Sequence, residues 1–226
     1  MFTVEYSGGL CQDSLSTYCG LEPLAIFDIL IIMRTILAAI AFAALAAGAG
    51  NQPINGRGSA SAPITMDVFT DFQCPGCKAM YESTLRPLID NYVDKGKVYL
   101  VHHEFPLPIH AFAIEAACYA RAARRIGKYE QVADVLFRQQ QSWASSGKVA
   151  ETACSVLTLG EAKQVMALAK DPSIAAEVQA DIKDGIAAHV DGTPTIFIKH
   201  GDKQYRVPTG TGYQILARFI DQLLSN

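Results

Sequence analysis

Two cysteines three residues apart, Cys74 and Cys77, have the residue type and spacing for redox chemistry. They lie in "TDFQCPGCKAMYE", residues 70–82, where an apolar run changes to a helical pattern. Side chains three apart on a helix share a face, with Cβ atoms about 5 to 6 Å apart, so the two sulfurs could form a disulfide after a small adjustment. The pair could also be half of a metal site, or two inert buried thiols.

The beginning of the helix would make the two sulfurs unequal. Cys74 would lie at the strand-to-helix junction, with Pro75 at the first helical position. Unpaired backbone N–H groups there would stabilise a Cys74 thiolate and lower its pKa below the usual value of about 8.5. A substrate thiolate could then attack the Cys74 sulfur of the oxidised pair, with Cys77 leaving as a thiolate, and a second substrate thiol would release Cys74.

The cysteine spacing argues against a zinc site. Structural zinc takes four ligands, often from two Cys-x-x-Cys pairs, and this sequence has one such pair. An inert pair would leave the helix N-terminus without a role. We therefore favour a redox-active dithiol, and we expect neither a metal nor a cofactor.

The sequence pattern predicts a strand on each side of the helix that begins at Pro75. Residues 64–70, "ITMDVFT", are typical of a buried strand, and the helical pattern runs from Pro75 to about Val93, with a kink or an interruption expected at Pro87. A second strand is expected at 97–105. It leads into the turn-forming connection "FPLPIH", where we expect His110 to shape the connection rather than to catalyse.

Helices follow until about residue 190. The first is a helix with one apolar face, expected from Phe112 to Ile126. The charged residues of the same region are expected to form a separate, solvated face: Arg121, Arg124, Arg125 and Lys128. A second helix is expected at 129–143. Two further helices have predicted N-caps: Thr158, in a capping box with Glu161, and Asp171, followed by Pro172.

The chain then returns to strands at 195–200 and 203–208, joined by a Gly201-Asp202 turn, before a terminal helix from about Tyr213. The order predicts an α/β fold in which a βαβ unit and a ββα unit share one sheet. The helices at about 110–190 are then an insertion between the two units, within a domain at 64–226.

The N-terminal part has a pattern typical of exported proteins. From Met33 the chain has one basic residue, an apolar stretch and the small triplet Ala47-Gly48-Ala49. We therefore expect residues 33–49 to be a signal peptide, cleaved after Ala49, and residues 1–32 to be a mis-assigned extension. Residues 50–63 are small and polar, and we expect a flexible lead-in there.

A membrane anchor at residues 24–47 is the alternative. The stretch is long enough to cross a bilayer, but Asp28 and Arg34 would each cost about 2.5 to 3.5 kcal/mol near the membrane centre. Both interpretations place the remaining chain in the periplasm or another extracytoplasmic compartment, and we favour cleavage.

Removing residues 1–49 takes away four of the 22 acidic and one of the 19 basic residues, which leaves 18 of each. A formal net charge of zero gives no long-range attraction for a nucleic acid, so we expect no such partner. Four of the six cysteines remain. Because disulfides persist outside the cytoplasm, we expect Cys118 and Cys154 to form a structural disulfide.

Three ordered motifs resemble those of the DsbA family of extracytoplasmic thiol–disulfide oxidoreductases: "DFQCPGC", "FPLPIH" and "GTPT", the last at 192–195. The resemblance covers most of residues 62–226 and implies a thioredoxin fold with a helical insertion. It further implies that Pro194 is cis and faces the cysteines, and that Thr193 presents its backbone to an extended substrate segment. We expect four residues to contact the substrate: Pro75, Gly76, Thr193 and Pro194.

The sequence departs from the family pattern at two places. The family commonly has a buried acid six residues before the first cysteine, where this chain has Val68, and the adjacent Asp67 should point to the other strand face. Proton transfer at Cys77 would then need another group or water. The Pro75-Gly76 pair also lacks the histidine of the best-known oxidases, which predicts a less acidic Cys74 and a weaker oxidant.

The leading hypothesis is an exported oxidase that acts on cysteine-containing exported proteins and exchanges electrons with a membrane redox partner. An extracytoplasmic reductase is the alternative within the same chemistry. A peptide-holding or metal-binding thioredoxin-like module is the alternative outside it. An isomerase is less favoured, because only about a dozen flexible residues precede the first strand and leave no room for a separate dimerisation domain. We expect a monomer.

Overall fold

The computed structural model describes residues 56–225. The expected extension at 1–32, the signal peptide at 33–49 and the alternative anchor at 24–47 lie outside these residues. None of the helices within 56–225 is both long and apolar enough to span a membrane.

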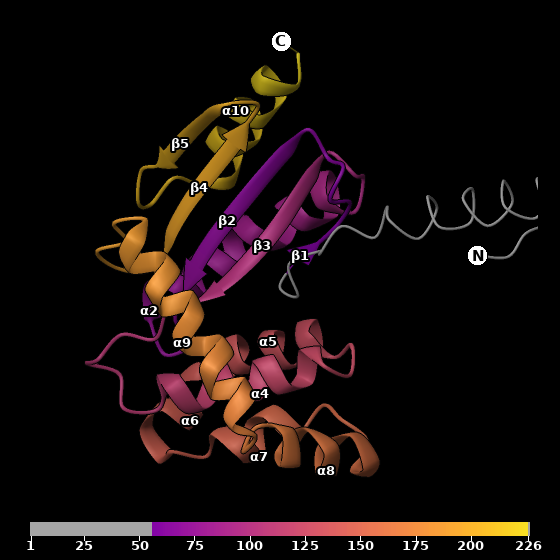
Figure 1. The fold of residues 1–226 in the computed structure, drawn as a ribbon, viewed down its shortest axis with the longest axis vertical. Coiled ribbons are helices and arrows are strands. Elements are labelled where there is room, and N and C mark those ends of the chain that lie inside the picture. Colours follow the sequence, from indigo (N-terminus) through magenta and orange to yellow (C-terminus); the bar gives the residue numbers. More distant parts are fainter. Residues whose placement is uncertain (1–55, 226) are drawn as a thin grey trace, which may run out of the picture. The chain divides into compact units, whose positions relative to one another are not determined.

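A five-stranded sheet, in the order β1-β3-β2-β4-β5, forms the centre of the fold (Figure 1). Its strands are β1 (Gly56–Arg57), β2 (Ile64–Thr70), β3 (Val98–Glu104), β4 (Thr195–His200) and β5 (Lys203–Val207). β2 is parallel to β3 and antiparallel to β4, while β5 is antiparallel to β4. The apolar residues of β2 are buried on both faces, which is why this short run forms a central strand.

The helix after β2 runs through residues 75–93 and changes its hydrogen-bond pattern on the way. It consists of α2 (Pro75–Met80), the π-helical turn η1 (Tyr81–Leu85), α3 (Arg86–Leu88) and the π-helical turn η2 (Ile89–Val93). Pro87 has no backbone N–H to donate to the preceding turn. The predicted interruption therefore takes the form of wider turns within a continuous helix.

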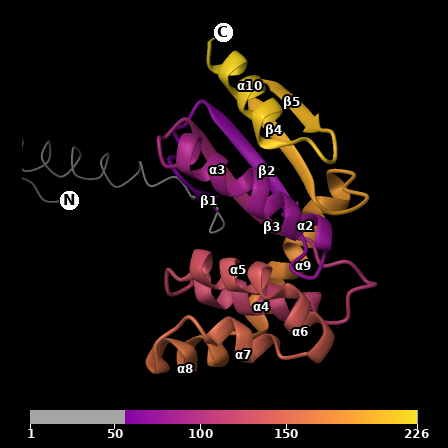
Figure 2. The ribbon, with the colours of Figure 1, turned by 180° about the vertical axis from the view of Figure 1, so that it is seen from behind.

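Six helices lie between β3 and β4 in the chain: α4 (Ala113–Arg124), α5 (Tyr129–Arg138), α6 (Gln140–Ser146), α7 (Val149–Cys154), α8 (Leu159–Leu168) and α9 (Pro172–Ala187). Figure 2 shows α4 to α8 beyond one end of the sheet. It also shows α2, α3 and α10 (Tyr213–Leu224) on one face of the sheet. The helical insertion ends in α9, which packs on α4 and β3.

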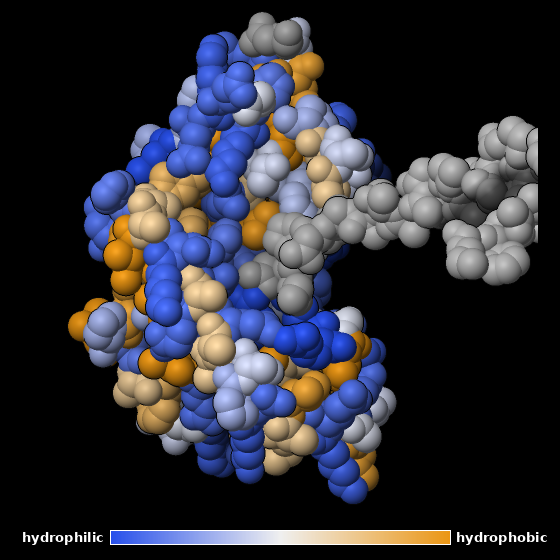
Figure 3. All heavy atoms as spheres, in the orientation of Figure 1, coloured by the Kyte–Doolittle hydropathy of each residue, from blue (hydrophilic) through white to orange (hydrophobic). Residues whose placement is uncertain are grey.

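The main apolar core lies between the sheet, the helix at 75–93 and α10, and it continues into the helical insertion. A small second cluster on the other face contains Phe69, Phe105, Val190 and Phe197. In the view of Figure 3, hydrophobic residues on the surface are interspersed with hydrophilic ones over the helices.

Several predicted elements match the structure closely. The strands at 64–70 and 195–200 have the predicted bounds. Thr158 and Glu161 form the predicted capping box of α8, and Asp171 caps α9 by accepting a hydrogen bond from the Ser173 N–H. These features depend on short stretches of sequence, which is why the pattern alone identifies them.

The helix predicted at 129–143 is wrong as a single element. It breaks at Gln139, whose backbone leaves the helical region between α5 and α6. After the break, Gln140 and Trp143 of α6 are both buried.

The lead-in predicted as flexible contains β1, which pairs with β3 at Gly56 and Arg57. Gly56 is required there because a Cβ atom would lie 1.8 Å from the hydroxyl oxygen of Tyr99. Arg57 forms ion pairs with Asp94 and Glu130. These contacts, made far along the chain, order the segment.

The predicted solvated face of α4 is wrong for Arg121. This side chain is 2% exposed and forms an ion pair with Asp181 of α9, which is also buried. Arg125, one turn further, remains exposed and pairs with Glu177. Helix α9 covers the part of α4 that the sequence pattern left open to solvent.

Candidate active site

Cys74 is the N-cap residue of the helix that begins at Pro75. Its backbone is extended, with φ −76° and ψ 121°, and its carbonyl accepts hydrogen bonds from the N–H groups of Cys77 and Lys78. Pro75 occupies the first helical position, where a missing N–H costs nothing. The end of β2 and this helix start together place Cys74 at the strand-to-helix junction.

The two thiols differ in burial and in acidity. Cys74 is 8% exposed, whereas Cys77 is completely buried. A hydrogen bond from the Cys77 thiol is the largest cause that lowers the Cys74 pKa, to about 5, against the opposing effect of burial. Thr193 and the backbone N–H groups of Gly76 and Cys77 lower it further. The helix-start donors therefore contribute as expected, but the neighbouring thiol contributes more.

Burial and the charge on Cys74 act in the opposite direction on Cys77. Burial is the larger cause, and together they raise the Cys77 pKa well above its ordinary value. The backbone N–H of Asp71 donates to Cys77 Sγ at 3.4 Å and partly offsets this effect. At neutral pH the site therefore holds one thiolate and one thiol.

The segment before β4 lies directly against the dithiol. The Thr193–Pro194 peptide bond is cis, and Cys74 Sγ lies 3.4 Å from the Thr193 carbonyl oxygen, to which it donates when it is protonated. A Cβ atom on Gly76 would lie 3.4 Å from Pro194 Cδ and 3.7 Å from Cys74 Sγ. Glycine therefore keeps the space between the helix start and the proline open.

The Thr193 side chain adds a donor to the same place. Its Oγ1 atom is buried and has no hydrogen-bond partner among the described residues. The side chain lowers the pKa of both Cys74 and Cys77, because a hydroxyl can donate to a thiolate.

A largely apolar hollow of about 330 Å³ begins beside Gly76 and Pro194. Its walls come from the helix at 75–93, from β4 and β5, and from the loop at 208–212, and its apolar lining residues include Met80, Ile196 and Val207. The hollow could receive an apolar side chain from a bound peptide segment.

The sequence did not identify two polar residues that organise the loop before Cys74. Gln140 donates to the carbonyl oxygens of Phe72 and Cys74, at 2.6 and 2.9 Å. Asp71 is buried and accepts hydrogen bonds from the Gln73 and Leu107 N–H groups. Asp71 lies within the DFQCPGC motif, which was the available signal, whereas nothing in the sequence separates Gln140 from the glutamines beside it.

The position six residues before Cys74 has the character that the sequence predicts. Val68 lies in the main core, and Asp67 points to the opposite face of β2. There the Asp67 carboxylate contacts His103 at 3.0 Å and Lys199 at 2.7 Å. The Asp67 carboxylate therefore belongs to a separate cluster with His103 and Lys199, on the face of β2 that points away from Cys77.

A family model described as Thioredoxin matches residues 51–220. The chain belongs to the thioredoxin family. Within this family its fold is like that of DsbA proteins. Wolbachia pipientis α-DsbA1 superposes with a TM-score of 0.63 at 21% identity, covering 76% of this chain and 90% of that one. BdbD from Bacillus subtilis superposes with a TM-score of 0.63 at 20% identity, covering 76% of this chain and 93% of that one.

Two curated proteins match part of this thioredoxin-family chain in sequence. The Na(+)/H(+) antiporter NhaA 3 of Salinispora tropica is 29% identical over 143 residues, which are 63% of this chain and 21% of that protein. A probable disulfide bond formation protein D of Bacillus cereus is 41% identical over 49 residues, 22% of this chain and 23% of that protein. The chain thus spans about a fifth of the length of the curated relatives it matches.

The predicted disulfide between Cys118 and Cys154 is not formed in this thioredoxin-family structure, where both are free thiols. They face different surroundings. Cys154 packs against the main core, whereas the charged neighbours of Cys118 are Glu104, Glu115 and Arg121.

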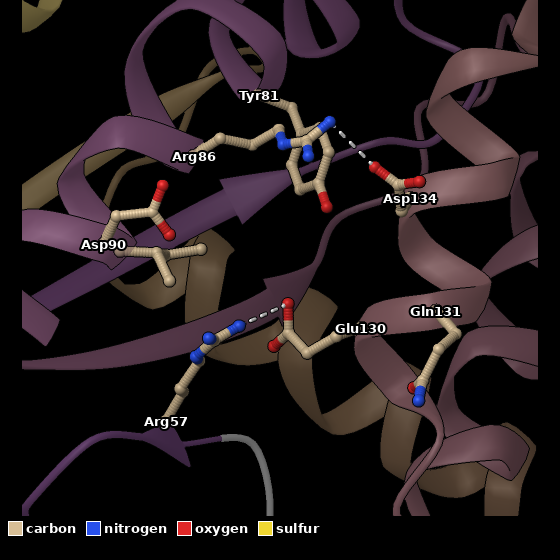
Figure 4. A pocket seen from close by; sticks show the side chains of 8 residues that line it. Arg57, Tyr81, Arg86, Asp90, Glu130, Gln131 and Asp134 are labelled. Carbon is tan, nitrogen blue, oxygen red and sulfur yellow. Dashed lines mark hydrogen bonds and ion pairs between the residues drawn. The ribbon is translucent and has the colours of Figure 1, made fainter. Parts of the chain in front are cut away.

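A second hollow, of about 340 Å³, lies where the thioredoxin-fold core meets the helical insertion (Figure 4). Arg57 pairs with Glu130 at 3.1 Å, and Arg86 pairs with Asp134 at 3.2 Å. The Tyr81 ring lies between these pairs (Figure 4). It stacks on the ring of Phe137 in α5, and the two ring centroids are 4.6 Å apart. The ion pairs and the stacked rings tie the two parts together at this surface.

Proposed function

We propose that this protein is an exported thiol–disulfide oxidoreductase that works as an oxidase through Cys74 and Cys77. The observation that carries the proposal is the opposite shift of the two thiol pKa values, to about 5 at Cys74 and well upward at Cys77. One sulfur is thereby suited to attack and departure as a thiolate, and the other to a return to the thiol form.

In the oxidised protein, a substrate thiolate attacks Cys74 Sγ, and the Cys74–Cys77 bond breaks as a substrate–Cys74 disulfide forms. Cys77 leaves with the electron pair and takes up a proton. A second substrate thiolate then attacks the substrate sulfur of the mixed disulfide, and Cys74 leaves as a thiolate. The substrate gains one disulfide and the protein takes up two electrons.

The acidity of Cys74 favours this direction. A thiolate that is stable at neutral pH stabilises the reduced form, which makes the disulfide form the stronger oxidant. A Cys74 pKa of about 5 lies between the values of about 7 and about 3.5 that are known for thioredoxin and for a strongly oxidising DsbA. This fits an oxidase weaker than the strongest ones, as the missing histidine predicts.

The substrates we propose are cysteine-containing exported proteins, bound in extended form beside Thr193 and Pro194. The backbone of Thr193 would pair with the substrate segment, and Pro75 and Gly76 would contact it from the other side. A neighbouring side chain of the substrate would enter the apolar hollow between Met80 and Val207. A membrane redox partner would restore the disulfide. The protein would act as a monomer and would have no nucleic-acid partner.

A metal-binding role has less support. Within residues 56–225, the group of side chains that could hold a metal ion consists of His103, Asp181 and Asp184, and it contains neither cysteine of the dithiol.

The test is oxidation of a reduced secreted protein that has one native disulfide. Oxidised wild-type protein should form that disulfide, and Cys74→Ser should be inactive. Cys77→Ser, which cannot hold the Cys74–Cys77 disulfide, is mixed instead with the oxidised substrate: its Cys74 thiolate should attack the substrate disulfide, release one substrate thiolate and accumulate a mixed disulfide at Cys74. A peptide-holding protein would keep its effect on substrate aggregation in Cys74→Ser. Wild-type protein that neither oxidises nor reduces the substrate in any glutathione buffer would refute the proposal.

Export has its own measurement. Cleavage after Ala49 predicts that the extracytoplasmic product begins at Gly50, whereas an anchor would leave residues 24–47 attached and the product in the membrane fraction. N-terminal sequencing of the full chain after expression distinguishes the two.

A further inference from the structure

The carboxylate of Asp71 holds the loop that carries Cys74. Its Oδ1 atom accepts from the Gln73 N–H at 2.7 Å, and its main-chain carbonyl accepts from the Cys74 N–H at 3.1 Å. Together these bonds form a tight turn between the end of β2 and the helix start. Because the Asp71 side chain is completely buried, this turn has no water to replace a lost partner.

The other oxygen of Asp71 connects this turn to the connection after β3. Oδ2 accepts from the Leu107 N–H at 2.8 Å and lies 2.6 Å from His110 Nδ1. A carboxylate can only accept, so Nδ1 carries the hydrogen of this short bond. His110 is thus the side chain that fastens the FPLPIH connection to the DFQCPGC turn.

The same turn aims one backbone donor at the buried sulfur. The Asp71 N–H points at Cys77 Sγ, at 3.4 Å. Cys77 must carry a negative charge each time it leaves Cys74 or attacks it, although it is fully buried. A fixed donor at that sulfur stabilises the transient thiolate, and its position depends on how firmly Asp71 is held.

We propose that His110 is a positioning residue for Cys77, which acts by donating from Nδ1 to Asp71 and so holds the Asp71 N–H against the Cys77 sulfur. The inference rests on the proposed function and deepens it. His110 would assist the step in which Cys77 bears charge, without exchanging a proton with either sulfur.

The chemistry of Asp71 argues against the alternative of direct acid–base catalysis. Both oxygens already accept from backbone N–H groups, and Oδ2 also faces His110, so the carboxylate is fully committed to structure. The contact that reaches Cys77 is made by the Asp71 backbone and not by its side chain. The pair therefore works through geometry.

Two substitutions at His110 separate these possibilities. His110→Ala removes the Nδ1 donor, whereas His110→Asn places an amide N–H near the same position but has no titratable ring. The assay is reduction of the Cys74–Cys77 disulfide by dithiothreitol, in which the reagent attacks Cys74 and Cys77 leaves as a thiolate. We expect the rate to fall about ten-fold in His110→Ala and to stay within about two-fold in His110→Asn.

A second measurement excludes a general loss of structure. In a Cys77→Ala background, alkylation of Cys74 reports on the other sulfur alone, and His110→Ala should leave its rate and its pH profile unchanged. His200→Ala, at the opposite end of β4 from the site, is the matched control and should behave as wild type in both assays. Asp71→Asn, which cannot accept at both oxygens, should lose rate as His110→Ala does.

Equal rates in wild type and His110→Ala would overturn the inference, as would a loss in His110→Asn as large as that in His110→Ala. A parallel change in Cys74 alkylation would show a merely structural role and would overturn it too. If the wild-type protein forms no reducible Cys74–Cys77 disulfide, the proposed function itself fails. That result is distinct from failure of the His110 inference, which is tested by comparing variants whose wild-type parent forms the disulfide.

Discussion

Cys74 Sγ lies 3.4 Å from the carbonyl oxygen of Thr193, a residue 119 positions further along the chain, and donates a hydrogen bond to it when protonated. The contact joins the first βα junction to the segment that leads into β4. Because β4 is antiparallel to β2, the end of β2 and the start of β4 lie at the same end of the sheet, with Phe69 opposite Thr195. The reactive sulfur is therefore placed by the sheet topology as well as by its own helix.

Thiolate absorbance as a function of pH should give a Cys74 pKa of about 5. At pH 7 about 99% of Cys74 would then be thiolate, while Cys77 stays protonated. Because the Cys77 thiol is the largest cause of the low value, Cys77→Ala should raise the Cys74 pKa. An ordinary value near 9 in wild-type protein would contradict the geometry of the site.

The same shift predicts how the stability of the reduced protein depends on pH. The folded chain loses the Cys74 proton near pH 5, while the unfolded chain keeps it until about pH 9, so the unfolded chain binds more protons between these values. The stabilisation is therefore complete above pH 9 and is lost as pH falls towards 5. Urea unfolding of reduced wild type and of Cys74→Ala should diverge across this range.

Thr193→Val should raise the Cys74 pKa by about one unit, since valine has the same shape but no hydroxyl donor for the thiolate. Thr193→Ser keeps the donor and serves as the control. The dithiol of Thr193→Val should also be less oxidising in glutathione buffers. Identical titrations for the valine and serine variants would show that the hydroxyl does not reach the sulfur.

Arg121→Met should cost about 3 to 5 kcal/mol in the free energy of unfolding, because it removes the guanidinium that pairs with the buried Asp181 carboxylate and leaves His103 as its remaining ion-pair contact. Arg125→Met removes the exposed pair with Glu177 and should cost less than about 1 kcal/mol. Chemical denaturation of both variants measures the difference. Similar losses at the two positions would mean that α9 does not shield Arg121.

Gly185→Ala should destabilise the protein by about 1 to 3 kcal/mol. A Cβ atom there would lie 2.5 Å from the ring of Phe105 and 3.2 Å from that of Phe69. Gly160→Ala, in α8, meets nothing within 4 Å and should be neutral or stabilising by up to about 1 kcal/mol. Thermal unfolding of the pair checks whether α9 packs this closely on the sheet.

Cys118 and Cys154 should both react with an alkylating agent after denaturation without reductant. The mass of the product should show two modified thiols when Cys74 and Cys77 are oxidised. No modification would restore the disulfide that the sequence predicted, and one modified thiol would indicate a different pairing.

The sequence predicted the elements whose signals are local. β2 and β4 are short, apolar and rich in branched residues, and the Thr158 cap needs only its partner three residues on. The position of Cys74 at a helix start also follows from local order, since Pro75 comes directly after it. Each of these features depends on residues close together in the chain.

Features that depend on distant partners could not be predicted in this way. Arg121 of α4 is buried because α9 packs on α4 and brings Asp181, 60 residues later in the chain, into an ion pair with it. β1 forms because β3 offers it an edge, and Gln140 reaches the active-site loop only after the break at Gln139. A single sequence contains no signal for such pairings.

The helical insertion leaves and rejoins the sheet at neighbouring points. Glu104, at its beginning, lies opposite Thr70 on one side of β2, and Thr195, at its end, lies opposite Phe69 on the other side. The two junctions are thus about 10 Å apart, twice the spacing of adjacent strands. Evolution could lengthen or trim the module between them without shifting the strand register, provided that a replacement for Gln140 still braced the reactive loop.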